Sequence, residues 1–294
     1  MHIHLTIIKK YAWAAYILLL LLSGLAYLIH NLMQAYDEGI ALEAEKKRLD
    51  SLNIPKDENG APYSIGNISG YHIQIPPGVS DSWITYNGDP NDFDFEAKRK
   101  YKRPPIDYDS KIAQFNFRFR LTDGALWRLG TQTDLDFEQD LQLKSTPWVK
   151  VIADADEKYP YIPQKTVMDN LFKSFSKPGS RPPLTYAGDE MAMEVYCYFG
   201  GKLPPPQNSW DKEEIYLYRH SNNQISTFIR CSNNPEFAEN FCNHNFFMPD
   251  NQLKVFFSMS YPREFLPQWQ HIETQAIQIV RGFVVPPASP LPSP

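Results

Sequence analysis

The chain has 294 residues, of which 43% are hydrophobic and 21% are charged, and its formal net charge is −5. This length is enough to bury one large core or two small ones. The slight acidic excess argues against nucleic acid as a main ligand, because phosphate binding normally brings a basic excess. The 25 prolines against 14 glycines indicate a loop-rich fold with strands, since Pro marks turns and strand edges.

The first pattern along the chain is an uncharged, apolar stretch from Tyr11 to Leu32. As a helix, about 20 such residues cross the ~30 Å hydrocarbon core of a bilayer. Two lysines precede the stretch and acidic residues follow it, so the positive-inside rule leaves residues 1–10 in the cytoplasm and the bulk of the chain outside. A cleaved signal peptide is the alternative, but its apolar core is usually only about 7–15 residues long. We therefore expect a single-pass transmembrane helix over residues 11–33.

The rest of the chain predicts an α+β fold of antiparallel sheets with packed helices. Residues 34–62 form a stalk and linker, because their apolar stripe is broken and ends in the turn-rich run NIPKDENGAP. We expect two α+β subdomains, at 63–180 and 181–284. The Pro-rich segment 285–294 has nothing to pack and is expected to be a disordered tail.

Alternating apolar and polar residues predict strands, and an apolar period near 3.6 predicts helices. The expected strands cover residues 71–75, 83–86, 114–121, 148–153, 191–199, 215–219, 224–230 and 253–261, and the expected helices cover 165–176 and 263–283. Between strands, a loop carries an acidic block at 89–96 and a basic block at 98–103. We interpret the two blocks as solvated charges that compensate one another, rather than as a calcium loop or a lipid contact.

The clearest strand is QFNFRFRL at 114–121, with phenylalanines on one face and Arg118 and Arg120 on the other. The two arginines are about 7 Å apart, as i and i+2 on one strand, and can clamp a partner's carboxylate. Pairing with acidic residues of the same chain is the alternative, and we favour it. Trp210, in the loop NSWDKEE, is a second candidate for partner binding, because exposed Trp often dominates interfaces. A loop plug is the alternative for Trp210.

Three cysteines lie in the second half of the chain. Cys231 and Cys242 bracket a ten-residue segment and are the favoured disulfide pair in an oxidising compartment, although the other two pairings stay possible. Closing so short a loop stabilises a fold by about 2–3 kcal/mol. Cys197, in an alternating segment, is expected to be a buried free thiol. Zinc bound by Cys231, Cys242 and His244 is the alternative, but the usual second C-x-x-C half is missing.

No common catalytic signature occurs in the sequence. There is no G-x-S-x-G, no H-E-x-x-H, no S-x-x-K with its companions and no phosphate loop. We therefore expect no catalytic residue, no metal and no cofactor, and we interpret His244 as a capping or packing residue. Spatial neighbours that form a nucleophile–base pair cannot be read from spacing.

A resemblance is carried by one motif in the C-terminal quarter: Cys231, then Cys242-x-His244-x-Phe246, a hydrophobic strand, and Tyr261-x-Arg263-x-x-Leu266-x-x-Trp269-x-x-Ile272. This motif resembles envelope immunity proteins of Gram-negative bacteria that are encoded beside type VI secretion effectors. The resemblance implies a single-pass inner-membrane protein with its bulk in the periplasm. Its partner would be a cognate effector toxin, such as a lipase, a peptidoglycan hydrolase or a pore-former, inhibited stoichiometrically and without turnover.

Three hypotheses follow from the sequence. The leading one is a membrane-anchored periplasmic immunity protein that binds and neutralises a cognate secreted toxin. The alternative is a structural or assembly component of a cell-envelope complex, which would favour self-association through residues 34–52. The third is an envelope hydrolase with an unrecognised site, which the absence of catalytic motifs disfavours.

Overall fold

The computed structural model describes residues 23–25, 27–36, 39–40, 42–44, 46–48, 50–52, 54–80, 84–91, 94–155, 164–176, 184–198, 213–233, 240–249 and 253–286. The chain divides into two compact units, Met1–Ile54 and Pro55–Pro294. Each unit is described by itself.

The first unit corrects the expectation of a transmembrane helix over residues 11–33. Its described helical residues include 23–25 and 27–36. Within the described ranges, no helix is both long enough and apolar enough to cross a membrane. The predicted anchor, and with it the predicted single-pass inner-membrane localisation, is therefore wrong for the described part of the chain. Residues 1–22 lie outside the described residues.

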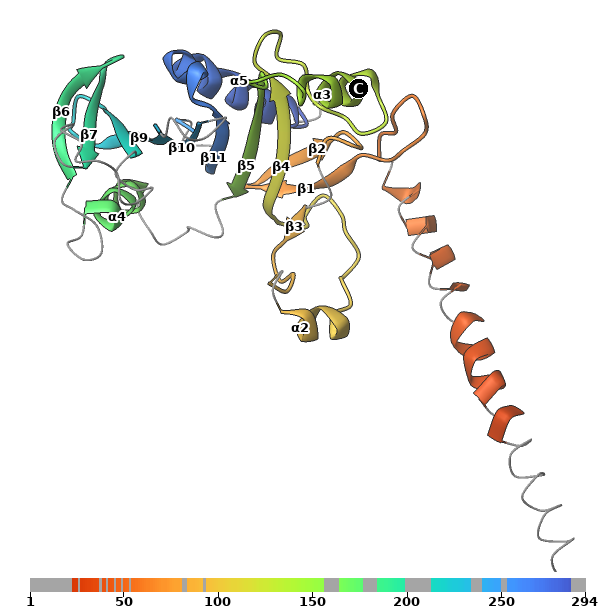
Figure 1. The fold of residues 1–294 in the computed structure, drawn as a ribbon. Coiled ribbons are helices and arrows are strands. Elements are labelled where there is room, and N and C mark those ends of the chain that lie inside the picture. Colours follow the sequence, from red (N-terminus) through yellow and green to blue (C-terminus); the bar gives the residue numbers. More distant parts are fainter. Residues whose placement is uncertain are drawn as a thin grey trace, which may run out of the picture. The chain divides into compact units, whose positions relative to one another are not determined.

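The second unit is built on one large antiparallel sheet, which contains nine strands among the described residues in the order β3-β4-β5-β11-β10-β9-β8-β7-β6 (Figure 1). The strands are β3 (Thr85–Tyr86), β4 (Ile112–Arg120), β5 (Trp148–Ala155), β6 (Leu184–Glu190), β7 (Met193–Tyr198), β8 (Glu213–Arg219), β9 (Ile225–Ser232), β10 (Phe241–Phe247) and β11 (Val255–Pro262). Strands from both expected subdomains join in this sheet. The subdomain boundary at 180/181 lies outside the described residues and stays a prediction.

One face of the sheet, which we call the inner face, is covered by the C-terminal helix. The 3₁₀-helix η4 (Arg263–Gln268) leads into α5 (Trp269–Gly282), whose buried residues are Trp269, Ile272, Ala276 and Val280. They pack on the alternating apolar residues of the strands, among them Phe115, Phe117 and Phe119 of β4. The sequence expected one helix over 263–283; it begins as a 3₁₀ turn because Pro267 lies in its first turns.

A separate hairpin of β1 (Ser64–Ile68) and β2 (Tyr71–Ile75) also packs into the inner-face core. Val284 bridges to Ile73, and the Val285 N–H donates to the His72 carbonyl at 2.9 Å. The start of the expected disordered tail is therefore paired with β2. Residues 287–294 lie outside the described residues.

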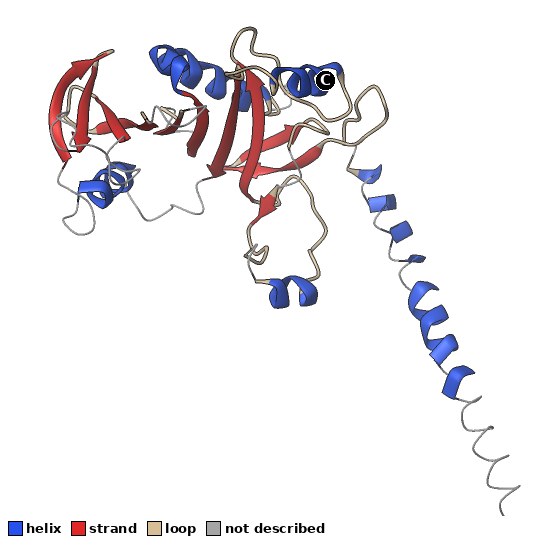
Figure 2. Cartoon of the chain, viewed as in Figure 1, coloured by secondary structure: helices blue, strands red, loops and turns tan. Residues whose placement is uncertain are grey.

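The opposite face, which we call the outer face, is contacted by two helices, which lie well apart in Figure 2. Helix α4 (Gln164–Ser176) buries Met168 against Ile215, Leu217 and Phe228 of β8 and β9. Helix α3 (Gln132–Asp140) packs Phe137 edge-on against Trp127 and Trp148, with ring centroids 6.3 and 5.6 Å apart. A short helix α2 (Phe95–Lys100) lies in the long connection between β3 and β4.

Candidate protein-binding surface

Five side chains on neighbouring strands form one row across the outer face. Arg118 of β4 lies opposite Lys150 of β5, which lies opposite Ser260 of β11. Ser260 lies opposite Asn243 of β10, and Asn243 lies opposite Arg230 of β9. Neighbouring strands are about 4.8 Å apart, so the row is about 19 Å long. We call these five residues the cross-sheet row.

The middle of the cross-sheet row is open to a partner. Lys150 and Asn243 are exposed and Ser260 is half-buried. Among the residues that the structure describes, the side chains of these three take part in no hydrogen bond or ion pair. They offer one charged donor, one hydroxyl and one amide on a rigid strand framework, which is the kind of polar set that recognises carboxylate and backbone groups.

Both ends of the cross-sheet row are fixed by aromatic rings of the flanking helices. The Arg118 guanidinium lies 4.9 Å from the centroid of Phe137 on α3 and 5.4 Å from that of Trp127. The Arg230 guanidinium lies 5.0 Å from the centroid of Phe175 on α4. Such cation–π contacts hold an arginine in place without neutralising its charge. The two terminal arginines are therefore pre-positioned cations.

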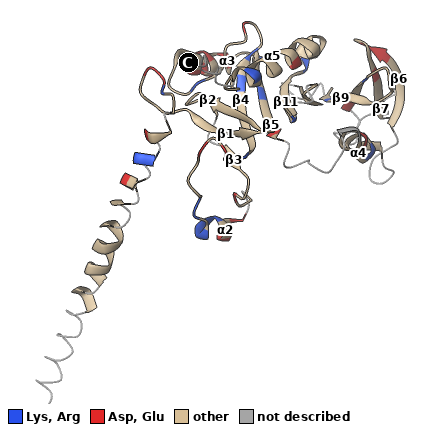
Figure 3. Cartoon of the chain, turned by 180° about the vertical axis from the view of Figure 1, so that it is seen from behind, with Lys and Arg blue, Asp and Glu red and all other residues tan. Residues whose placement is uncertain are grey.

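The charged residues of the cross-sheet row are all positive. The row contains three cations and no acid, and Arg118 and Lys150 lie directly opposite each other, an arrangement of like charges that disfavours folding. Glu213 Oε1 lies 4.0 Å from Arg230 Nη1 at one end of the row. Figure 3 shows the basic residues of β4 in blue. A local positive potential of this kind attracts acidic groups.

Arg120, the other predicted clamp residue, is engaged within the chain. Its guanidinium donates to Asp123 at 2.7 and 3.0 Å and to Asp136 of α3 at 2.9 Å, and lies 5.5 Å from the centroid of Trp148. The hydrogen bond with Arg120 lowers the pKa of Asp123. For Asp136, a hydrogen bond from Gln132 lowers the pKa first, and Arg120 adds to it. Arg120 thus ties the turn after β4 and helix α3 to the sheet.

The partner-binding role of Arg118, Arg120 and Trp210 stays a prediction. The structure brings Arg118 beside Lys150 and turns Arg120 toward acidic residues of its own chain. Trp210 lies outside the described residues. Sequence reasoning missed Lys150, Ser260, Asn243 and Arg230, because only the pairing register places them in one row. The signal available in the sequence was that each of these residues alternates with largely apolar residues along its own strand, which places it on the polar face.

The expected disulfide is present between Cys231 and Cys242, which are direct cross-strand partners on β9 and β10 with Cα atoms 4.0 Å apart. Both half-cystines are buried on the inner face, so they bind no zinc. Cys197 is free and half-buried, and burial raises the pKa of its thiol.

A buried polar network lies beneath α5. His244 Nε2 is 2.9 Å from Glu273 Oε1, and His244 Nδ1 is 3.0 Å from the Tyr261 hydroxyl. The Thr227 hydroxyl donates to the same Glu273 oxygen at 2.7 Å. The histidine–carboxylate pair is of a catalytic type, but the side chain of His244 has no exposed surface and Tyr261 is fully buried. The network therefore fastens α5 to the sheet.

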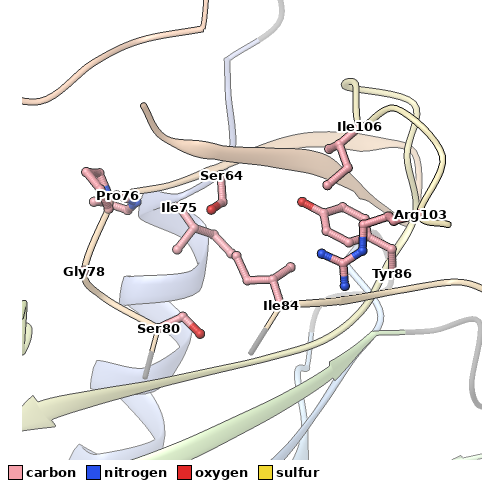
Figure 4. A pocket seen from close by; sticks show the side chains of 10 residues that line it. Ser64, Ile75, Pro76, Gly78, Ser80, Ile84, Tyr86, Arg103 and Ile106 are labelled. Atoms are coloured by element: carbon pink, nitrogen blue, oxygen red, sulfur yellow. The ribbon is translucent and has the colours of Figure 1, made fainter. Parts of the chain in front are cut away.

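A pocket of about 260 Å³ lies between β2 and the base of the β3–β4 connection (Figure 4). Ile75, Ile84 and Ile106 give it an apolar lining. Two of the polar groups around it already have partners: the Tyr86 hydroxyl donates to the Ile65 carbonyl at 2.7 Å, and the Ser80 hydroxyl bonds to Asn116. Within the described ranges, no cluster of three His, Cys, Asp or Glu side chains could hold a metal ion.

Comparison with known proteins gives one structural likeness. No protein-family model and no curated protein matches the chain. Among solved structures, an immunity protein of the Stenotrophomonas maltophilia type IV secretion system is similar, with a TM-score of 0.49 and 14% sequence identity. The match covers 79% of this chain and 99% of that one.

Proposed function

We propose that this chain is an immunity protein, a stoichiometric inhibitor that binds a secreted effector toxin through the outer face of its sheet. The observation that carries the proposal is the cross-sheet row: three cations and two neutral polar side chains, fixed at both ends by aromatic rings and without partners in the middle. Like charges placed opposite each other on a strand pair oppose folding, and an acidic partner surface removes that repulsion.

The chemistry of the surface supports binding rather than turnover. The row offers donors and fixed positive charge, which give specificity and fast association with an acidic partner. The histidine–carboxylate pair under α5 has no access for a substrate. The disulfide on the inner face suits a compartment in which disulfides persist.

The proposal covers immunity to a secreted effector without naming the secretion system or the toxin's activity. The sequence motif resembles proteins paired with type VI effectors, whereas the structural neighbour belongs to a type IV system. That neighbour is too distant to transfer a function, and the proposal rests on the surface of this chain.

The test is binding of the full chain to the purified effector encoded by the adjacent gene, measured by calorimetry and by rescue of growth when both are co-expressed. We expect one-to-one binding and rescue. Lys150→Glu reverses the charge at the exposed centre of the row and is expected to weaken binding at least about tenfold, mainly through a slower association rate. Raising the salt concentration is expected to weaken the wild-type complex, because surface charges are screened.

Arg281→Glu is the matched control, since it makes the same change in net charge on α5, on the opposite side of the sheet. Equal losses for the two variants would mean that net charge, and not the row, controls binding. Recovery of the chain in a large self-assembled complex, without effector binding, would favour the structural or assembly role instead.

A further inference from the structure

The connection between β3 and β4, residues 87–110, projects from the sheet with α2 at its far end (Figures 1 and 2). We call this segment the arm. Its described residues belong to none of the elements that form the cross-sheet row or the network under α5. Specific side-chain hydrogen bonds and ion pairs nevertheless occur at both the base and the tip of the arm.

The base of the arm is locked. Arg103 Nε and Nη2 donate to the two carboxylate oxygens of Asp89 at 3.1 and 2.6 Å, which joins the outgoing limb to the returning one. The Asp89 side chain is only 5% exposed and also accepts the Tyr86 N–H at 2.9 Å. The Arg103 guanidinium lies 5.5 Å from the centroid of the Tyr86 ring, and the Tyr86 hydroxyl is bonded to β1.

Burial raises the pKa of Tyr86 to about 12, so this anchoring hydroxyl keeps its proton at neutral pH. Figure 4 shows Arg103 beside Tyr86 at the edge of the pocket. A bidentate ion pair with one nearly buried partner restricts the arm far more than an exposed pair would. The base of the arm is therefore fixed before any partner arrives, which lowers the entropic cost of binding.

The tip of the arm presents an aromatic side chain surrounded by charge. Phe95, the first residue of α2, is 72% exposed. Asp94 caps the helix by accepting the Ala97 N–H at 2.9 Å, and Glu96 pairs with Lys100 at 2.7 Å. Arg99 and Lys102 are exposed and have no side-chain partner among the described residues. Figure 3 shows the basic side of α2 at the end of the arm.

We propose that the arm is a second docking element, which places Phe95 in an apolar pocket of the effector whose rim carries carboxylates that meet Arg99 and Lys102. This proposal rests on the proposed function and names a contact separate from the cross-sheet row. An exposed Phe on a support that is fixed at its base gives a large apolar contact at little conformational cost. The two free cations define the charge of the surface that fits around it.

An anionic lipid surface is the competing occupant, because basic residues beside an aromatic ring also suit headgroups. Asp94 and Glu96 flank Phe95 on both sides, and anionic headgroups would repel them. A protein pocket with a patterned rim accommodates both signs of charge. The proposal is therefore a protein partner.

The experiment uses the full chain and the purified effector of the adjacent gene, with Phe95→Ala and Arg99→Glu as test variants. Because aromatic anchors dominate interface energies, we expect Phe95→Ala to weaken binding about 10–100-fold, mainly through faster dissociation. Arg99→Glu is expected to weaken it about tenfold, mainly through slower association. Tyr186→Ala, which removes another exposed aromatic ring from β6 at the opposite end of the sheet order, is expected to leave binding unchanged.

A further variant, Asp89→Asn, weakens the lock at the base while leaving the tip intact. We expect it to slow association, with Tyr186→Ala again as the unaffected control. In the complex, backbone amides of residues 94–103 are expected to exchange more slowly with deuterium than in the free protein.

The outcomes separate the two proposals. If the wild-type chain binds no effector, the proposed function fails and the arm proposal fails with it. If the wild type binds and Phe95→Ala binds equally well, the arm proposal alone is overturned. Phe95-dependent binding to phosphatidylglycerol vesicles, with effector binding unchanged in Phe95→Ala, would assign the arm to a lipid surface and also overturn it.

Discussion

The two faces of the same sheet differ in what their alternating residues do. On the inner face, Phe115, Phe117 and Phe119 of β4 are almost completely buried and pack with α5 in one large cluster. On the outer face, the intervening residues of the same strand include Asn116, Arg118 and Arg120. Strand residues point alternately to opposite faces, so a single nine-residue strand supplies both the centre of the core and one end of the cross-sheet row.

This difference separates stability from recognition within one element. The larger buried cluster lies on the inner face and contributes more to the folding free energy than the smaller one under α4. The inner-face polar groups, such as His244, are hydrogen-bonded and buried. On the outer face, Lys150 and Asn243 are exposed and open to a partner. Substitutions on the two faces should therefore change different measured quantities.

The largest expected effect is on the inner face. Phe117 is 1% exposed, and its ring centroid lies 6.1 Å from that of Phe115 and 6.2 Å from that of Phe283. Phe117→Ala leaves a cavity that its neighbours cannot fill, and we expect it to lower the free energy of unfolding by about 3–5 kcal/mol. Urea denaturation followed by tryptophan fluorescence measures the change.

Lys150→Ala is the matched outer-face control, because Lys150 belongs to the strand that pairs with β4. It is exposed, so we expect its unfolding free energy to stay within about 0.5 kcal/mol of the wild type. Comparable losses in the two variants would contradict the separation of roles between the faces.

An effect of intermediate size is expected for the polar network that fastens α5 to the inner face. Glu273→Ala removes the acceptor shared by His244 and Thr227 and leaves buried donors unpaired. We expect a loss of about 1–3 kcal/mol in unfolding free energy, measured by thermal and urea denaturation. Glu273→Gln keeps an oxygen acceptor and should lose less. If both variants lose equally, the negative charge rather than the hydrogen bonding of Glu273 fastens α5.

Strong local patterns made much of the fold predictable. The alternation in QFNFRFRL predicts β4, and the apolar stripe from Phe265 to Phe283 predicts most of α5. The segments that the sequence did not predict have weaker patterns. Helix α3 has the sequence QTDLDFEQD, in which the acidic residues are used to accept bonds from Trp127, Arg120 and Trp148 rather than to face solvent.

The candidate surface could be predicted only in part. Sequence periodicity places Arg118 on a polar face, but the register of five strands decides that Lys150, Ser260, Asn243 and Arg230 join it. A shift of one residue in any pair would send those side chains to the other face. The apolar stretch at 11–33 shows the converse limit, because composition alone predicted a membrane helix that the described residues do not contain.

The smallest expected effect is on the outer face, where Arg120 holds the turn and α3 to the sheet. The hydrogen bond from Arg120 lowers the pKa of Asp123 below its value in the unfolded chain. A lowered folded-state pKa adds stability above the unfolded value of about 4, and that stability is lost as the pH falls through the folded value. Asp123 is half-exposed, so screening limits the contribution to about 1 kcal/mol or less.

Asp123→Asn should therefore be slightly less stable than the wild type at pH 7, and the two stability curves should converge as the pH falls below about 4. Urea titrations in steps of about one pH unit between pH 2 and pH 7 measure this difference in unfolding free energy. Added salt should reduce the difference, because it screens the charges. A difference that persists unchanged at low pH would contradict a role for the Asp123 charge, because asparagine keeps an oxygen that can accept the Ala125 N–H. In that case Asp136 and the ring of Trp148, rather than Asp123, would hold Arg120 in place.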